Sequence, residues 1–337
     1  MPAKSITIPL DPTSDLETRR GLRIQASIGS SPSRPPFMID TGSTGILVSK
    51  EYVGPDAERQ DNMPFELLYT TSLNSYTGYW YKTSVSFYHN DKPLSVSTTP
   101  MMVRVPDVYT PNPATGKPPV NDPKGVCMMG VGFDRPSDVA GKDAQGHTIP
   151  IDINPFLLIA GVSPSTGLNP GFILTSTSIT LGLTPSEPYY PDFTIIQLTR
   201  PPPPPPGHGK REWIAPLVQI SVPTRPEMAP FKASLLLDTG YNKALVYAPG
   251  DAIIPTEKGV VDNQENLVVS ILAASGAHVP IYNFVTGKTP PAGNAPDEVD
   301  WFPSTKLAPF INTGMRPIMH LDYLYDDVNG RLGFRLK

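Results

Sequence analysis

Cysteine and charge are both scarce in this sequence. The 337 residues include one cysteine, Cys127, so no disulfide can form within the chain. Charged residues make up 17%, with 27 Lys and Arg against 31 Asp and Glu, and no basic stripe stands out. Because nucleic-acid binding depends on clustered positive charge, we expect no nucleic-acid partner.

Long apolar runs are also missing. No run approaches the ~20 residues that span a bilayer, so the sequence predicts no membrane segment. Residues 1–21 lack the continuous apolar core of a signal peptide, and no Asn-x-Ser/Thr sequon occurs. With a single cysteine, these absences favour a cytoplasmic or otherwise intracellular protein. The alternative is a secreted mature chain whose leader has been removed.

Proline and glycine are abundant. The 43 Pro and 27 Gly make up 70 of the 337 residues, or about 21%, against a usual ~12%. Helices tolerate these residues poorly, whereas short strands joined by turns accommodate them. Strand-like alternation also recurs, for example at 5–10 and 22–28. Composition and pattern therefore predict an all-β protein with long loops.

The chain is expected to form two lobes around a proline-rich junction. Residues 1–185 would form the N-terminal lobe, 186–210 the junction and 211–337 the C-terminal lobe. The junction contains six consecutive prolines, Pro201–Pro206, which favour a stiff polyproline II spacer. A docking motif for an SH3-type partner is the alternative, and nothing else in the sequence supports it.

A repeated triplet is the feature that points to chemistry. Asp40-Thr41-Gly42 recurs as Asp238-Thr239-Gly240, 198 residues later, and each triplet lies between two apolar strand-like runs. A duplicated lobe would bring the two loops together across a pseudo-twofold axis. Two carboxylates a few ångström apart share one proton, so one can act as a base and the other as an acid towards a single water.

The other triplet residues are expected to support this dyad. Gly42 and Gly240 allow the backbone to turn tightly beside each carboxylate. Thr41 and Thr239 carry hydroxyls that can link the two loops across their interface.

Over nearly its whole length the sequence resembles the pepsin family of aspartic proteases. The resemblance is carried by the first active-site loop (37–44), an apolar-apolar-Gly element (128–133), the opening strand of the second lobe (213–220), the second loop (236–240) and a closing hairpin (314–334). It implies a bilobal all-β fold with two pseudo-twofold-related lobes and a central cleft. Asp40 and Asp238 would be the catalytic residues.

The family also carries a tyrosine on a flap over the cleft. Tyr69 occupies the matching place, and Tyr76 is the alternative. We expect residues 69–79 to form a hairpin that overhangs the cleft. Leu47 stands where the family has a tryptophan that supports the flap tyrosine.

Two further positions concern the dyad itself. Ser43 follows the first triplet, and the resemblance implies that it hydrogen-bonds Asp40. Tyr241 follows the second triplet, where the family has Thr or Ser, and it lies at the cleft with the flap tyrosines. A phenol cannot place its oxygen where a short hydroxyl would lie, so we expect Asp238 to lack one hydrogen bond and to carry the shared proton. The second apolar-Gly element, Asn312-Thr313-Gly314, is more polar than usual.

The implied activity is that of an aspartic-type endopeptidase acting through a water activated by the dyad. The alternative is a non-proteolytic enzyme on the same fold that uses the dyad for acid–base chemistry, such as cyclisation or dehydration, on a small molecule. A non-catalytic binding protein is disfavoured because both acids are present. The 39 residues before Asp40 leave room for the first strands but not for an inhibitory prosegment.

The expected partner is a peptide or small-molecule substrate in the cleft, bound by a monomer. No cofactor is expected. The five histidines are scattered without ligand spacing, so the sequence predicts no metal site.

Overall fold

Strands and loops make up the protein. The computed structural model describes residues 4–17, 20–135, 140–142, 148–150, 152–185, 190–202, 213–262, 264–272, 277–287 and 295–337. This part of the chain contains 27 strands and four short 3-10 turns, η1 (Lys50–Tyr52), η2 (Pro113–Thr115), η3 (Pro164–Thr166) and η4 (Arg316–Met319), but no α-helix. None of these turns is long and apolar enough to cross a membrane. The all-β prediction is confirmed.

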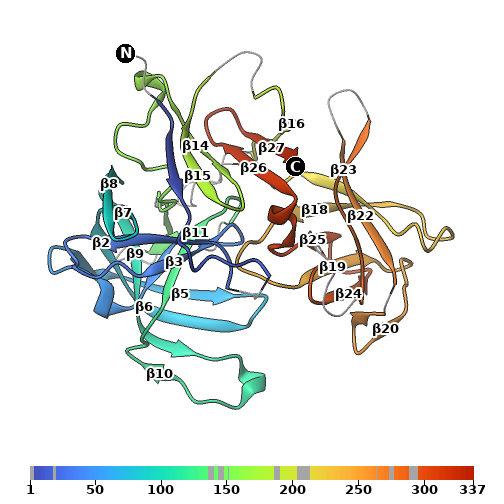
Figure 1. Ribbon diagram of the computed structural model, residues 1–337. Helices are drawn as coiled ribbons and strands as arrows, with labels where there is room; N and C mark the ends of the chain where they lie inside the picture. The colour runs from blue at the N-terminus through green and yellow to red at the C-terminus, as the bar shows by residue number, and fades with distance from the viewer. Residues whose placement is uncertain are drawn as a thin grey trace.

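A ten-stranded sheet is built from residues 23–131 (Figure 1). Its order is β5-β6-β9-β4-β11-β3-β2-β7-β8, and β10 pairs with β9. The bounds are β2 (Arg23–Ile28), β3 (Pro36–Asp40), β4 (Thr44–Val48), β5 (Glu58–Tyr69), β6 (Asn74–Thr83), β7 (Val85–His89), β8 (Lys92–Ser97), β9 (Met101–Thr110), β10 (Val120–Asn121) and β11 (Cys127–Val131).

A nine-stranded sheet lies on the other side of the molecule, at the right of Figure 1. Its order is β20-β21-β24-β19-β25-β18-β17-β22-β23. The bounds are β17 (Leu217–Ser221), β18 (Phe231–Leu236), β19 (Ala244–Pro249), β20 (Thr256–Glu257), β21 (Val260–Val261), β22 (Asn266–Leu272), β23 (His278–Val285), β24 (Val299–Ser304) and β25 (Phe310–Asn312).

A six-stranded sheet draws strands from both ends of the chain. Its order is β1-β15-β14-β26-β27-β16, and β12 (Ala140–Lys142) pairs separately with β13 (Thr148–Pro150). The bounds are β1 (Ile6–Pro9), β14 (Asn169–Leu174), β15 (Ser178–Leu183), β16 (Thr194–Gln197), β26 (Leu321–Asp326) and β27 (Arg331–Leu336). Because β14 pairs antiparallel with β26, hydrogen bonds join segments from the two sides of the expected junction. The division into lobes at 185 and 211 stays a prediction. Positions 186–189 and 203–212 lie outside the described residues, and they include most of the proline run.

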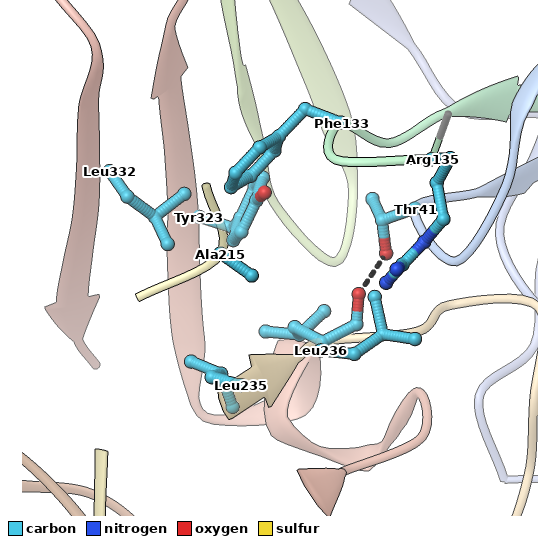
Figure 2. Close-up of a pocket in the computed structure, with 9 residues that line it drawn as sticks. Thr41, Phe133, Arg135, Ala215, Leu235, Leu236, Tyr323 and Leu332 are labelled. Atoms are coloured by element: carbon cyan, nitrogen blue, oxygen red, sulfur yellow. Dashed lines mark hydrogen bonds between the residues drawn. The ribbon is translucent and has the colours of Figure 1, made fainter. Parts of the chain in front are cut away.

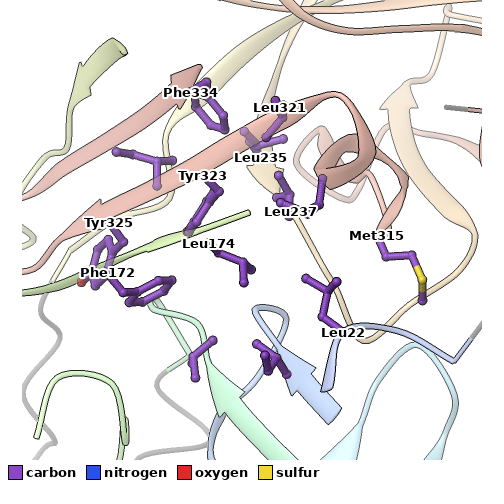
Figure 3. Packing of buried hydrophobic residues seen from close by; sticks show 14 of the residues in the cluster. Leu22, Phe172, Leu174, Leu235, Leu237, Met315, Leu321, Tyr323, Tyr325 and Phe334 are labelled. Carbon is purple, nitrogen blue, oxygen red and sulfur yellow. The ribbon is translucent and has the colours of Figure 1, made fainter. Parts of the chain in front are cut away.

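One apolar core connects the three large sheets. Figure 3 shows side chains of the six-stranded sheet packing with those of the neighbouring sheets. Among the residues drawn are Leu22, Phe172, Leu174, Leu235, Leu237 and Tyr323. Each fully buried leucine or phenylalanine contributes roughly 1.5–3 kcal/mol relative to an exposed one. This shared core holds the two sides of the molecule in a fixed relation.

The two outer sheets repeat one local arrangement, which positions the site. In the first, β11 lies between β3 and β4, parallel to β3 and antiparallel to β4. In the second, β25 lies between β18 and β19 with the same two orientations. Each Asp-Thr-Gly triplet therefore lies at or just after the end of a strand, β3 or β18, that pairs in parallel with a strand from later in the sequence, β11 or β25.

Candidate active site

The first triplet begins at the last residue of β3, and the second begins two residues after β18. Gly130 of β11 pairs with Asp40, so β11 passes directly beneath the first loop. A Cβ at Gly130 would lie 2.8 Å from the Ser43 Oγ and 2.8 Å from the Gly45 carbonyl oxygen. Only glycine permits this close passage.

The two threonines join the loops. The Thr41 N–H donates to the Thr239 Oγ1 at 3.0 Å, and the Thr239 N–H donates to the Thr41 Oγ1 at 3.0 Å. The Thr41 hydroxyl then donates to the Leu237 carbonyl at 2.5 Å (Figure 2), and the Thr239 hydroxyl donates to the Ile39 carbonyl at 2.7 Å. Both side chains are buried. This closed set of bonds fixes the spacing between the two loops.

The glycines of the triplets face the opposite carboxylates. A Cβ at Gly42 would lie 2.3 Å from the Asp238 Cγ, and one at Gly240 would lie 2.7 Å from the Asp40 Cγ. Each carboxyl group therefore packs on the backbone of the opposite loop. The structure brings Asp40 and Asp238 together, as the repeat predicts.

Each carboxylate accepts a backbone and a side-chain hydrogen bond. Asp40 accepts from the Gly42 N–H at 2.7 Å and from the Ser43 hydroxyl at 2.5 Å. Asp238 accepts from the Gly240 N–H at 2.9 Å and from the Asn312 Nδ2 at 2.7 Å. Both aspartates are buried, with 3% and 6% of their surface exposed.

The expectation that Asp238 lacks a hydrogen bond is wrong. Asn312, at the end of β25, donates a side-chain hydrogen bond to Asp238. Tyr241 lines the cleft, where burial and the charge of Asp300 raise its pKa to about 12. The polar character of 312–314 was visible in the sequence. Its partner was not, because Asn312 and Asp238 are 74 positions apart.

The carboxyl groups hold protons more tightly than free aspartates do. Burial and the neighbouring charge of Asp238 raise the pKa of Asp40 to about 7, although the Ser43 and Gly42 donors oppose this. Burial also raises the pKa of Asp238, opposed by hydrogen bonds from Asn312, Asp40 and Gly240 and by the positive charge of Arg135. Such a pair retains one proton over a wide pH range.

A cavity of about 540 Å³ opens above the dyad. The flap hairpin, formed by β5, β6 and the turn at residues 70–73, lines one side of it, so the expected hairpin is present. Tyr69 and Tyr76 both line the cavity, with their rings edge to face at 6.0 Å. Tyr76 also stacks on Tyr109 at 4.9 Å, and burial raises the pKa of Tyr76 to about 12. Leu47 lies in an apolar cluster with partly buried Tyr69 and Tyr76 packed against it.

The tip of the flap hairpin is tied to the loop after β9. Asn112 donates from its Nδ2 to the Ser72 carbonyl at 3.0 Å. The Asn74 Oδ1 accepts from the Asn112 N–H at 3.1 Å and from the Tyr109 hydroxyl at 3.2 Å. No sequence motif indicated these contacts, which join segments almost 40 residues apart.

Arg135 is a second residue that the sequence analysis missed. Its Nε donates to the Gly42 carbonyl at 3.0 Å, and its Nη1 donates to the Asp134 carbonyl at 3.2 Å. The side chain borders both the cleft and a small cavity of about 10 Å³ behind the loops (Figure 2). Asp134 accepts from the Ala215 N–H at 2.8 Å, which attaches this segment to the start of the second half.

Side chains of the types that bind metal ions do not cluster in the part of the chain that the structure describes. No group of three or more His, Cys, Asp or Glu side chains there could hold an ion.

Of three comparisons with known proteins, the one with solved structures supports the fold. No protein-family model matches the sequence, and a search of curated proteins finds no match. Among solved structures, the chain is similar to an aspartic proteinase from Irpex lacteus, with a TM-score of 0.62 and 15% sequence identity. The match covers 99% of this chain and 98% of that chain. The all-β fold is shared with aspartic proteinases over nearly its full length.

Proposed function

We propose that this protein is an aspartic-type endopeptidase. The observation that carries the proposal is the placement of two buried carboxyl groups against each other at the base of an open cavity. Linked loops hold both groups in place, and a hairpin borders the space above them. This arrangement suits the activation of one water molecule towards a carbonyl group.

The reaction would proceed by general acid–base chemistry. The ionised carboxylate takes a proton from a water molecule, whose oxygen attacks the carbonyl carbon of the peptide bond. The protonated carboxyl group donates its proton to the carbonyl oxygen, which stabilises the tetrahedral intermediate. The carboxyl group that took the proton of the water gives it to the leaving nitrogen as the C–N bond breaks, and the other carboxyl group regains its proton from a hydroxyl of the intermediate. No covalent bond to the protein forms.

The cavity walls favour apolar side chains of an extended substrate. On the side of the nine-stranded sheet, Leu245, Tyr247 and Phe310 line the cavity. The register places Tyr247 beside Phe310, with their ring centroids 6.1 Å apart. The flap hairpin faces them with Leu68, which is 51% exposed. A substrate that covers these surfaces would gain binding energy from the apolar area it buries.

An unbiased peptide library, digested from about pH 3 to about pH 8, tests the proposal directly. The wild type should cleave, and both Asp40→Asn and Asp238→Asn should lose cleavage by at least about 10³-fold. Asp61→Asn is the matched control, because Asp61 is 83% exposed. If the folded wild type cleaves no peptide at any pH, the endopeptidase proposal is wrong. A cavity of this size also lies within the ~300–1,000 Å³ of small-molecule sites, and such a result would move the proposal to acid–base chemistry on a small molecule.

A further inference from the structure

Asn312 has a fixed orientation beside Asp238. Its Oδ1 accepts a hydrogen bond from the Gly314 N–H at 2.9 Å, and its side chain is completely buried. An amide with its oxygen engaged in this way must turn its NH2 group to the other side. That group lies 2.7 Å from the Asp238 Oδ2.

An amide and a hydroxyl respond differently to a proton. The Ser43 hydroxyl can donate to an ionised Asp40, or rotate and accept from a protonated one. The Asn312 Nδ2 can only donate, so it stabilises an ionised Asp238 more strongly than a protonated one. The side-chain donors to the two carboxyl groups, Ser43 and Asn312, therefore differ in how they respond to a proton, although the Asp-Thr-Gly loops are repeated.

One of the surrounding charges acts in the same direction. The titratable and charged groups that act on Asp238 are Asp40 from the opposite loop, Arg135 from the segment after β11, and Tyr241 from its own loop. The Arg135 guanidinium is the cation among them, and it favours negative charge on Asp238. The charge of Asp300 acts in turn on Tyr241, whose pKa it raises.

From this geometry we propose that Asn312 is a positioning residue that keeps Asp238 ionised and places the shared proton on Asp40. In the resting protein Asp238 would then be the base that accepts the proton of the water, and Asp40 the acid that donates to the carbonyl oxygen. This assignment rests on the proposed function and reverses the one expected from Tyr241 alone. The asparagine takes over the hydrogen bond of a short hydroxyl, which leaves position 241 free to line the cavity.

The test follows each carboxyl group by itself. Protein labelled with 13C at the aspartate carboxyl carbons is titrated by NMR in two backgrounds. In Asp40→Asn the signal of Asp238 titrates without its partner, and in Asp238→Asn that of Asp40 does. Each signal is assigned by its loss in the corresponding variant. We expect Asp238 to titrate at the lower pH of the two.

Removing the side-chain amide of Asn312 should raise the pH at which Asp238 titrates. Adding Asn312→Leu to the Asp40→Asn background should raise the titration midpoint of Asp238 by about 1 to 2 pH units, the usual effect of a hydrogen bond to a charged group. Adding Tyr241→Thr as well should lower it again, because a short hydroxyl can then reach Asp238. Asp61→Asn in the same Asp40→Asn background is the control, and it should leave the midpoint within about 0.3 units, because the Asp61 side chain is 83% exposed.

The proposal is overturned if Asp238 titrates at a higher pH than Asp40, or if Asn312→Leu leaves its midpoint unchanged. Should Asn312→Leu not fold, the comparison of the two single-aspartate backgrounds decides alone. The titrations need no substrate. If the titrations are as expected but no peptide is cleaved, the endopeptidase proposal is refuted and the role of Asn312 stands. If peptides are cleaved but the titrations are opposite to those expected, only the role of Asn312 is refuted.

Discussion

Replacing Asp40 with asparagine should make the stability of the protein less dependent on pH. Burial and Asp238 raise the pKa of Asp40 from 3.8 to about 7, so between these values the folded protein holds a proton that the unfolded chain has released. The resulting stabilisation is fully present below about pH 3.8 and is lost as the pH rises through about 7. Asparagine has nearly the same shape and is neutral throughout this range.

The size of the effect follows from the two pKa values. Each pH unit between 3.8 and about 7 lowers the free energy of unfolding of the wild type by about 1.4 kcal/mol. Over the whole interval the loss is about 4 kcal/mol, a substantial part of the ~5–15 kcal/mol of a typical protein. Asp40→Asn should avoid most of this loss and be the more stable protein at neutral pH.

Urea denaturation at about pH 4, 5, 6 and 7 measures the effect, with the slope of each transition checked for constancy. Asp61→Asn is the control, because its exposed carboxylate should leave the pH dependence of the wild type intact. If the wild type and Asp40→Asn give parallel curves of stability against pH, the protein does not hold a proton at Asp40 in this range. The account of the buried dyad would then be wrong.

Three other substitutions probe the site and its supports. Gly42→Ala would place a Cβ 2.3 Å from the Asp238 Cγ, whereas normal contacts need about 3.5 Å. Peptide cleavage should therefore fall about 100-fold, and full activity would contradict this prediction. Gly250→Ala is its control, because that Cβ meets an exposed threonine side chain. Arg316→Met removes the cation that pairs with buried Asp297 at 3.0 Å; it should destabilise by about 3–5 kcal/mol in urea, and an unchanged midpoint would rule this out. Asn112→Ala removes the bond to the tip of the flap hairpin and should speed hydrogen exchange of the tip amides about 5-fold; equal rates would show that the bond does not restrain the tip.

Local features of the sequence determined the fold class and the identity of the dyad. An abundance of proline and glycine disfavours helices wherever it occurs in a chain, so composition alone pointed to strands and loops. The Asp-Thr-Gly triplets carry a carboxylate, a hydroxyl and a tight turn within three residues. Their recurrence therefore predicted a symmetric meeting of Asp40 and Asp238 without knowledge of the intervening chain.

Contacts between distant strands could not be determined in this way. Asp238 receives its donor from Asn312 because β25 lies parallel to β18 in a register that pairs Leu236 with Asn312. Arg135 reaches Gly42, and Asn112 holds Ser72, across similar separations. The sequence contains all of these side chains, but only the register of the folded sheets brings each one within hydrogen-bonding distance of its partner. Such bonds form over about 3 Å, and a shift of one residue moves a side chain to the other face of its sheet.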